Sequence, residues 1–140
     1  MKSYRPAVAA IGRLLISVIF IMSGLGKIAD PTGTQVYIAA AGLPVPLIAY
    51  LTAILVELGG GVLLVIGYQT RIVALVMTAF TLAAALGFHN NFADQNQMIH
   101  FLKNISMMGG LLQVVAFGAG AFSLDGRAAR NRGRAATAIA

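Results

Sequence analysis

The sequence contains no cysteine and no tryptophan, and only 10% of its 140 residues are charged. Without cysteine the chain cannot form disulfides, CxxC redox centres or thiolate metal sites. A soluble domain has about 25% charged residues on average, so the shortage of charge argues against a soluble protein. Hydrophobic residues make up 59% of the chain, and the mean hydropathy is +0.84. These values predict a membrane protein with a single domain.

Four apolar segments are long enough to cross a bilayer as helices, at residues 7–26, 48–67, 72–88 and 101–120. A signal peptide also begins basic and then apolar, but its apolar core is shorter and ends at a cleavage site. The first segment is therefore predicted to be a retained span. Asp30-Pro31 is a helix-start signal and predicts a short interfacial helix at residues 32–41, while Asp94 is the expected N-cap of the last helix. The predicted fold is an all-α, four-helix transmembrane bundle over residues 1–125, followed by a basic, disordered cytoplasmic tail at residues 126–140.

The net charge of +6 would suit nucleic-acid binding if the basic residues gathered on one soluble face. They lie instead at segment ends, so we expect no nucleic-acid partner and read them as determinants of membrane orientation. With four spans, both termini and the turn near Arg71 share one side. That side collects Lys2, Arg5, Arg71, Arg127, Arg130, Arg132 and Arg134, and only Lys27 and Lys103 lie toward the other. Both termini are therefore predicted to be cytoplasmic, and we expect the arginine-rich tail to contact anionic lipid.

The second span, residues 48–67, carries a single charge, Glu57, near its middle. A carboxylate at the centre of a membrane helix costs roughly 2.5–3.5 kcal/mol, so it normally faces a partner or a cavity. Helical side chains lean toward their own N-terminus, so Glu57 leans outward and Lys27, at the outer end of the first span, leans back into the bilayer. These directions rank Lys27 first as the partner, then Lys103, then Arg13. A purely structural ion pair and a protonated Glu57 both remain open.

Each span carries a stripe of polar and small residues at helical spacing, as close-packed membrane interfaces do. Together the stripes predict a polar axis that opens toward the outer side. His89 and His100 lie near the outer surface, but no cluster of further ligands accompanies them. We therefore predict neither a metal site nor a haem.

An ordered series of short motifs runs along most of the chain: GR (12–13), SGLGK (23–27), Glu57 before a glycine cluster, GxxTR (67–71), FHNNF (88–92), FLKN (101–104) and GG (109–110). No single motif is specific, but their order and spacing resemble the DoxX family of small bacterial inner-membrane proteins. The resemblance implies a four-helix membrane bundle. Some members of that family are associated with quinone-linked or sulfur-compound oxidoreductases, or with complexes that resist oxidative and thiol stress. The family's polar set falls on Arg13, Lys27, Glu57, His89, Lys103 and Asn104.

Three functions are compatible with these residues. The protein could be a subunit or accessory of a membrane redox system, in which Lys27, Lys103 or His89 hydrogen-bonds a quinone carbonyl and Glu57 sets their charge or relays a proton. It could instead be a small-solute or proton transporter, or a non-catalytic assembly protein. No intrinsic cofactor is expected, a quinone is the candidate ligand, and any enzymatic activity would belong to an oxidoreductase complex. A redox partner subunit and a homo-oligomer both remain open.

The orientation is tested by reporter fusions in the native membrane. Fusions after Thr70 and after Asp125 should report a cytoplasmic location, and fusions near Gly33 and Ala93 an exported one, because the basic residues favour the cytoplasmic side. A cytoplasmic signal from the Gly33 fusion would invert the topology and reverse the direction in which Glu57 leans.

Overall fold

The computed structural model describes residues 4–139, which form helices and contain no strand. The helices are, in chain order, α1 Arg5–Ala29, α2 Pro31–Ala40, α3 Pro46–Ile54, the π-helical turn η1 Leu55–Gly59, α4 Gly60–Ile66, α5 Thr70–Phe88, α6 Gln95–Phe117 and α7 Leu124–Ile139. Four stretches are long and apolar enough to span a membrane: α1, the continuous Pro46–Ile66, α5 and α6. The predicted all-α bundle with four transmembrane helices is confirmed.

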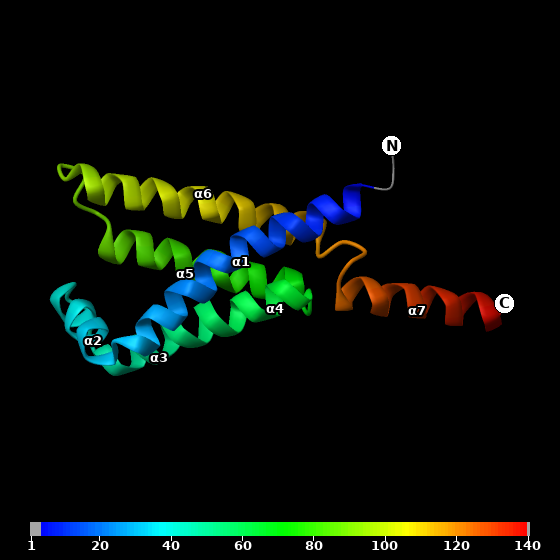
Figure 1. Cartoon of the computed structure of the whole chain (residues 1–140), viewed down its shortest axis with the longest axis horizontal. Helices are drawn as coiled ribbons and strands as arrows, with labels where there is room; N and C mark the ends of the chain where they lie inside the picture. The colour runs from blue at the N-terminus through cyan, green and yellow to red at the C-terminus, as the bar shows by residue number, and fades with distance from the viewer. Residues whose placement is uncertain (1–3, 140) are drawn as a thin grey trace.

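Two helical hairpins make up the bundle (Figure 1). One pairs α5 with α6, and in the other α1 packs along α3, η1 and α4. Glycines in α4 let the helices approach closely: a Cβ at Gly60 would lie 2.8 Å from Met77 Sδ, and one at Gly61 would lie 2.7 Å from Ile21 Cγ1. The glycine cluster is therefore a packing surface, as the sequence predicted. The buried core consists of Phe20, Leu64, Ala74, Met77 and Leu111.

The short helix α2 lies at the end of the bundle where the two hairpins diverge (Figure 1). It begins as predicted, with Pro31 in the first turn and the Asp30 carboxylate accepting a hydrogen bond from the Gly33 backbone N–H at 2.9 Å. It ends before Gly42, whose φ of +78° suits a residue without a side chain. Because α2 packs against α3, it belongs to the first hairpin.

The opposite end of the bundle, where the chain termini lie, is held together by two charged side chains. Arg13 is 3% exposed and donates hydrogen bonds to the carbonyl oxygens of Leu64 at 3.3 Å and Phe122 at 2.7 Å. Asp125 accepts hydrogen bonds from the backbone N–H groups of Gln69 at 2.9 Å and Thr70 at 2.8 Å. The Thr70 hydroxyl donates a third at 2.7 Å. These bonds tie the segment after α6 to α1 and to the start of α5.

The chain after residue 124 is helical, although the sequence analysis predicted a disordered tail. Alanine and arginine, which dominate α7, are among the residues that favour helix most. The Ser123 hydroxyl accepts a hydrogen bond from the Gly126 backbone N–H at 2.9 Å and so caps the first turn. Arg130 donates to the Ala121 carbonyl oxygen at 3.0 Å, and the helix projects beyond the bundle (Figure 1).

Asp125 makes this attachment dependent on pH. Burial would raise the pKa of Asp125, but the hydrogen bonds from Thr70 and Gln69 and the charge of Arg13 outweigh it and hold the pKa below its usual value. A group whose pKa is lower in the folded state stabilises that state fully above its unfolded pKa, about 3.9, and loses this contribution as the pH falls further. We expect Asp125→Asn to lower stability at pH 7 by about 1 kcal/mol, and the gap to wild type to close below about pH 4. Thermal unfolding in nanodiscs from pH 7 to 3 measures this, and a gap that is constant with pH would contradict it.

Candidate functional site

Glu57 lies in η1, the π-helical turn in the middle of the second span, and its side chain is 9% exposed. A π-turn widens the helix by one residue per turn and is found frequently at functional sites. The three glycines at positions 59–61 follow directly, and glycine weakens the preference for regular helix. The irregular turn thus coincides with the one carboxylate of the span.

The partner of Glu57 is Lys27, whose Nζ lies 2.7 Å from Glu57 Oε2 and 2.9 Å from Ser23 Oγ. The Lys27 side chain is 24% exposed, so the pair is mostly withdrawn from solvent. A Cβ at Gly24 would lie 3.0 Å from Leu58 Cβ, so a glycine one turn before Lys27 lets α1 come close to η1. Lys27 was ranked first from side-chain direction, and the structure confirms this pairing.

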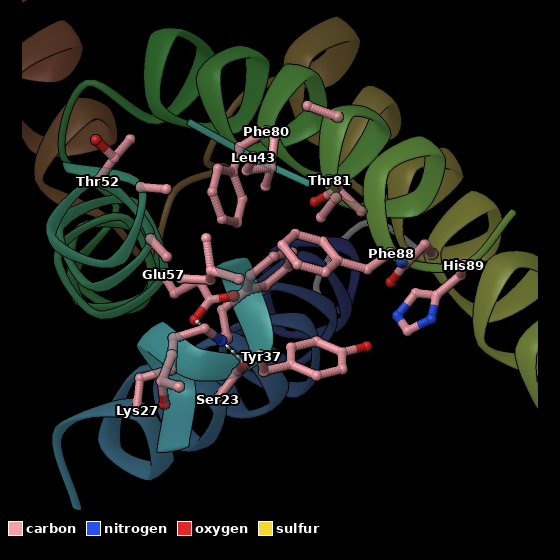
Figure 2. A pocket seen from close by; sticks show the side chains of 18 of the residues that line it. Ser23, Lys27, Tyr37, Leu43, Thr52, Glu57, Phe80, Thr81, Phe88 and His89 are labelled. Carbon is pink, nitrogen blue, oxygen red and sulfur yellow. Dashed lines mark hydrogen bonds and ion pairs between the residues drawn. The ribbon is translucent and has the colours of Figure 1, made fainter. Parts of the chain in front are cut away.

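A cavity of about 650 Å³ opens beside this ion pair, between α1, α2, α3 and η1 on one side and α5 and α6 on the other (Figure 2). One wall of the cavity is aromatic: the rings of Tyr37 on α2 and Phe88 on α5 stack with centroids 5.3 Å apart and planes 14° apart. Phe20 and Phe80 also line the cavity. The cavity lies at the end where the hairpins diverge.

Four of the six predicted polar residues line this cavity together with Glu57: Lys27, His89, Lys103 and Asn104. Asn104 is 8% exposed, so its carboxamide is almost fully enclosed while it contacts the cavity. Arg13 is the sixth, and the structure places it at the opposite end of the bundle, bonded to backbone carbonyls. Arg13 is therefore a packing residue of the termini end and does not belong to the cavity.

Two histidines lie together at the end of α5 and the start of α6, and His89 lines the cavity. His89 Nδ1 lies 2.9 Å from Gln97 Oε1, so this nitrogen is the donor of the pair. His100 Nδ1 lies 3.0 Å from Lys103 Nζ and accepts from the ammonium. The two imidazole rings stack with centroids 5.0 Å apart. Within residues 4–139, no group of three or more His, Cys, Asp or Glu is placed to hold a metal.

Sequence reasoning found the charged members of the site but missed its aromatic wall and Ser23. Ser23 had a signal, because it precedes Lys27 by one helical turn within SGLGK. Tyr37 and Phe88 stack across helices that are distant in sequence, and neither residue type is unusual in a membrane protein. A pairing of this kind becomes visible only when the packing of α2 and α5 is known.

The cavity combines a flat aromatic wall with hydrogen-bond donors at several positions, namely the ammonium of Lys103, the carboxamide of Asn104 and the imidazole of His89. Apolar walls with a few placed polar groups are typical of small-molecule sites. The Lys27–Glu57 ion pair carries no net charge, so it adds a dipole to the cavity lining and does not change the net charge of that lining. The arrangement suits a planar, largely apolar molecule that carries hydrogen-bond acceptors.

Known proteins similar to this chain are also membrane proteins. The sequence model of the DoxX family matches residues 8–90. The Inner membrane protein YqjF of Escherichia coli (strain K12) is 39% identical over 128 residues, which cover 89% of this chain and 95% of that protein. The Inner membrane protein YphA of the same organism is 35% identical over 128 residues, covering 88% and 91%. No solved structure matches the chain. The chain belongs to the DoxX family and is a multi-pass protein of the bacterial inner membrane.

Proposed function

We propose that the cavity binds a quinone or a similar planar carbonyl compound, and that the protein acts as a subunit or accessory of a membrane redox system. The observation that carries this proposal is the stacked Tyr37–Phe88 pair, which lines the same cavity as several hydrogen-bond donors inside a membrane bundle. Aromatic side chains favour stacked or edge contacts with other flat rings. A quinone head group supplies such a ring together with two carbonyl acceptors.

The size of the cavity supports a ligand of this kind. Its volume of about 650 Å³ lies within the usual range of ligand pockets, roughly 300–1,000 Å³. Two of its lining residues, Thr52 on α3 and Ala83 on α5, are also exposed on the surface of the bundle. In a membrane protein, that surface faces lipid, so a ligand dissolved in the bilayer could enter between α3 and α5.

Some hydrogen-bond donors of the cavity are used within the protein, and we assign others to the ligand. Lys27 already donates to Glu57 and Ser23, so two of its three donors are used within the protein and it positions the carboxylate. Among the described residues, Lys103 is exposed and hydrogen-bonds His100 alone, and an ammonium has three donors. Lys103 and Asn104 are thus the residues we assign to the carbonyl oxygens. Because the chain has no cysteine or tryptophan, we propose that electrons pass between the bound quinone and a partner subunit.

We also propose that the cavity opens on the outer side of the membrane. Lys27 and Lys103 mark the cavity end, whereas Arg71 and the arginines of α7 belong to the termini end. Basic residues favour the cytoplasmic side, so the termini end is assigned to the cytoplasm. A quinone bound at the other end would then exchange protons with the outer compartment.

Binding of a quinone analogue to purified protein in nanodiscs tests the proposal. Lys103→Met should weaken binding roughly tenfold, because it removes a charged hydrogen bond to a carbonyl oxygen while leaving the bundle assembled. Asn104→Leu should weaken it for the same reason. Ser106→Ala is the matched control, because Ser106 lies on the same helix, bonds its own backbone at Leu102 and does not line the cavity. If wild type binds no analogue at membrane-relevant concentrations and no redox partner co-purifies, the transport or assembly function replaces this proposal.

A further inference from the structure

Two polar side chains enclosed in the bundle have hydrogen-bonding atoms that the protein does not use. Lys27 Nζ bonds Glu57 through Oε2, and no residue within 4–139 hydrogen-bonds Glu57 Oε1. The carboxamide of Asn104, a buried residue, has no hydrogen-bond partner in that range either. Among the buried side chains of the described residues, Arg13 Nε is the one fully enclosed nitrogen or oxygen without a partner. The unused atoms of Glu57 and Asn104 therefore reach open space.

The open space that these atoms reach is the cavity beside the ion pair. Glu57 and Asn104 both line it, and Figure 2 shows the Glu57 side chain pointing into it. They approach it from different hairpins, because Glu57 lies in η1 and Asn104 lies in α6 next to Lys103. One side of the cavity thus presents a hydrogen-bond acceptor, and the other side presents donors.

The three groups differ in which ligand atoms they can bond. A carboxylate only accepts hydrogen bonds, an ammonium only donates them, and a carboxamide does both. Lys103 and Asn104 can therefore donate to a carbonyl oxygen and to a hydroxyl oxygen alike. Glu57 Oε1 can bond a hydroxyl, but against a carbonyl oxygen two acceptors would face each other. An enclosed acceptor left without a donor is costly, so Glu57 distinguishes the two kinds of ligand oxygen.

We propose that Glu57 makes the cavity select the reduced, hydroquinone form of its ligand, whose ring hydroxyl donates to Oε1. This inference rests on the proposed function, because it takes a quinone as the ligand. The two oxygens of a 1,4-hydroquinone lie at opposite edges of the ring, which suits an acceptor on one hairpin and donors on the other. A hydrogen bond to a carboxylate is charge-assisted and stronger than one between neutral groups. The hydroquinone should bind roughly tenfold tighter than the quinone, which raises the midpoint potential of the bound two-electron couple by about 30 mV.

Binding of one analogue in both redox states to wild-type protein in nanodiscs tests this selectivity. The probe is a short-tailed benzoquinone, used oxidised and as the hydroquinone kept reduced by dithionite, with uptake by empty nanodiscs subtracted. The chain has no cysteine, so the reductant has no disulfide to cleave. Wild type that binds both forms equally, or the quinone more tightly, overturns this inference and leaves the proposed function standing. Binding of neither form overturns both.

Glu57→Gln separates ligand selection from structural support. Because the Lys27 ammonium only donates, the carboxamide oxygen of the glutamine stays on it and the NH₂ group faces the cavity as a donor. The preference should then invert, with the quinone bound more tightly than the hydroquinone. Lys103→Met is the matched control: an ammonium donates to carbonyl and hydroxyl oxygens alike, so both affinities should fall and their ratio should stay as in wild type.

Circular dichroism shows whether each variant folds. A folded Glu57→Gln protein that keeps the wild-type ratio of affinities, including one in which both affinities fall equally, overturns the inference, because that is the result of a purely structural role. If Glu57→Gln does not fold, the comparison of the two redox states on wild type decides.

Discussion

The ion pair between Lys27 and Glu57 is the constraint on which the rest of the bundle depends. A carboxylate and an ammonium inside a membrane each carry a large desolvation cost, and only close pairing with further hydrogen bonds offsets it. The structure provides the 2.7 Å contact between them and the Ser23 hydroxyl beside the ammonium. It also provides a glycine in α1 where η1 comes closest. The irregular η1 turn and the close approach of α1 at Gly24 occur where these two groups meet.

The two ends of the bundle have different roles. At the termini end, Arg13 and Asp125 hydrogen-bond to backbone groups of α4, of α5 and of the segment after α6. These bonds hold the helices together at that end. At the other end the hairpins diverge, and the ion pair forms part of a cavity wall (Figure 2). A bundle fixed at one end can hold an open cavity, with apolar walls and a few polar groups, at the other end without losing its register. This division accounts for the different roles of Arg13 and Lys27, two basic residues of the same helix, α1.

The free-energy cost of placing charged groups inside a membrane is the reason that the spans and the ion pair could be predicted from the sequence. The four spans follow from hydropathy, and Lys27 follows as the partner of Glu57 from helix direction alone. The packing between helices could not be predicted from the sequence. The Tyr37–Phe88 wall depends on the relative placement of α2 and α5. The π-turn depends on the local conformation of the helix at Glu57. The position of Arg13 depends on backbone carbonyl groups, which every sequence has. Helix α7 is consistent with its alanine and arginine content, because both residues favour helix.

The most direct test of the account is a double-mutant cycle on Glu57, with the free energy of unfolding measured in lipid. Glu57→Ala alone should lower stability by about 3–5 kcal/mol, because Lys27 is left partly buried without its counter-charge, and removing Lys27 as well should recover part of that loss. The coupling energy with Lys27 should be about 1–3 kcal/mol and should exceed the coupling with Lys103 and with Arg13. A coupling with Lys27 near zero, or one smaller than that with Lys103 or Arg13, would contradict the central role of this ion pair.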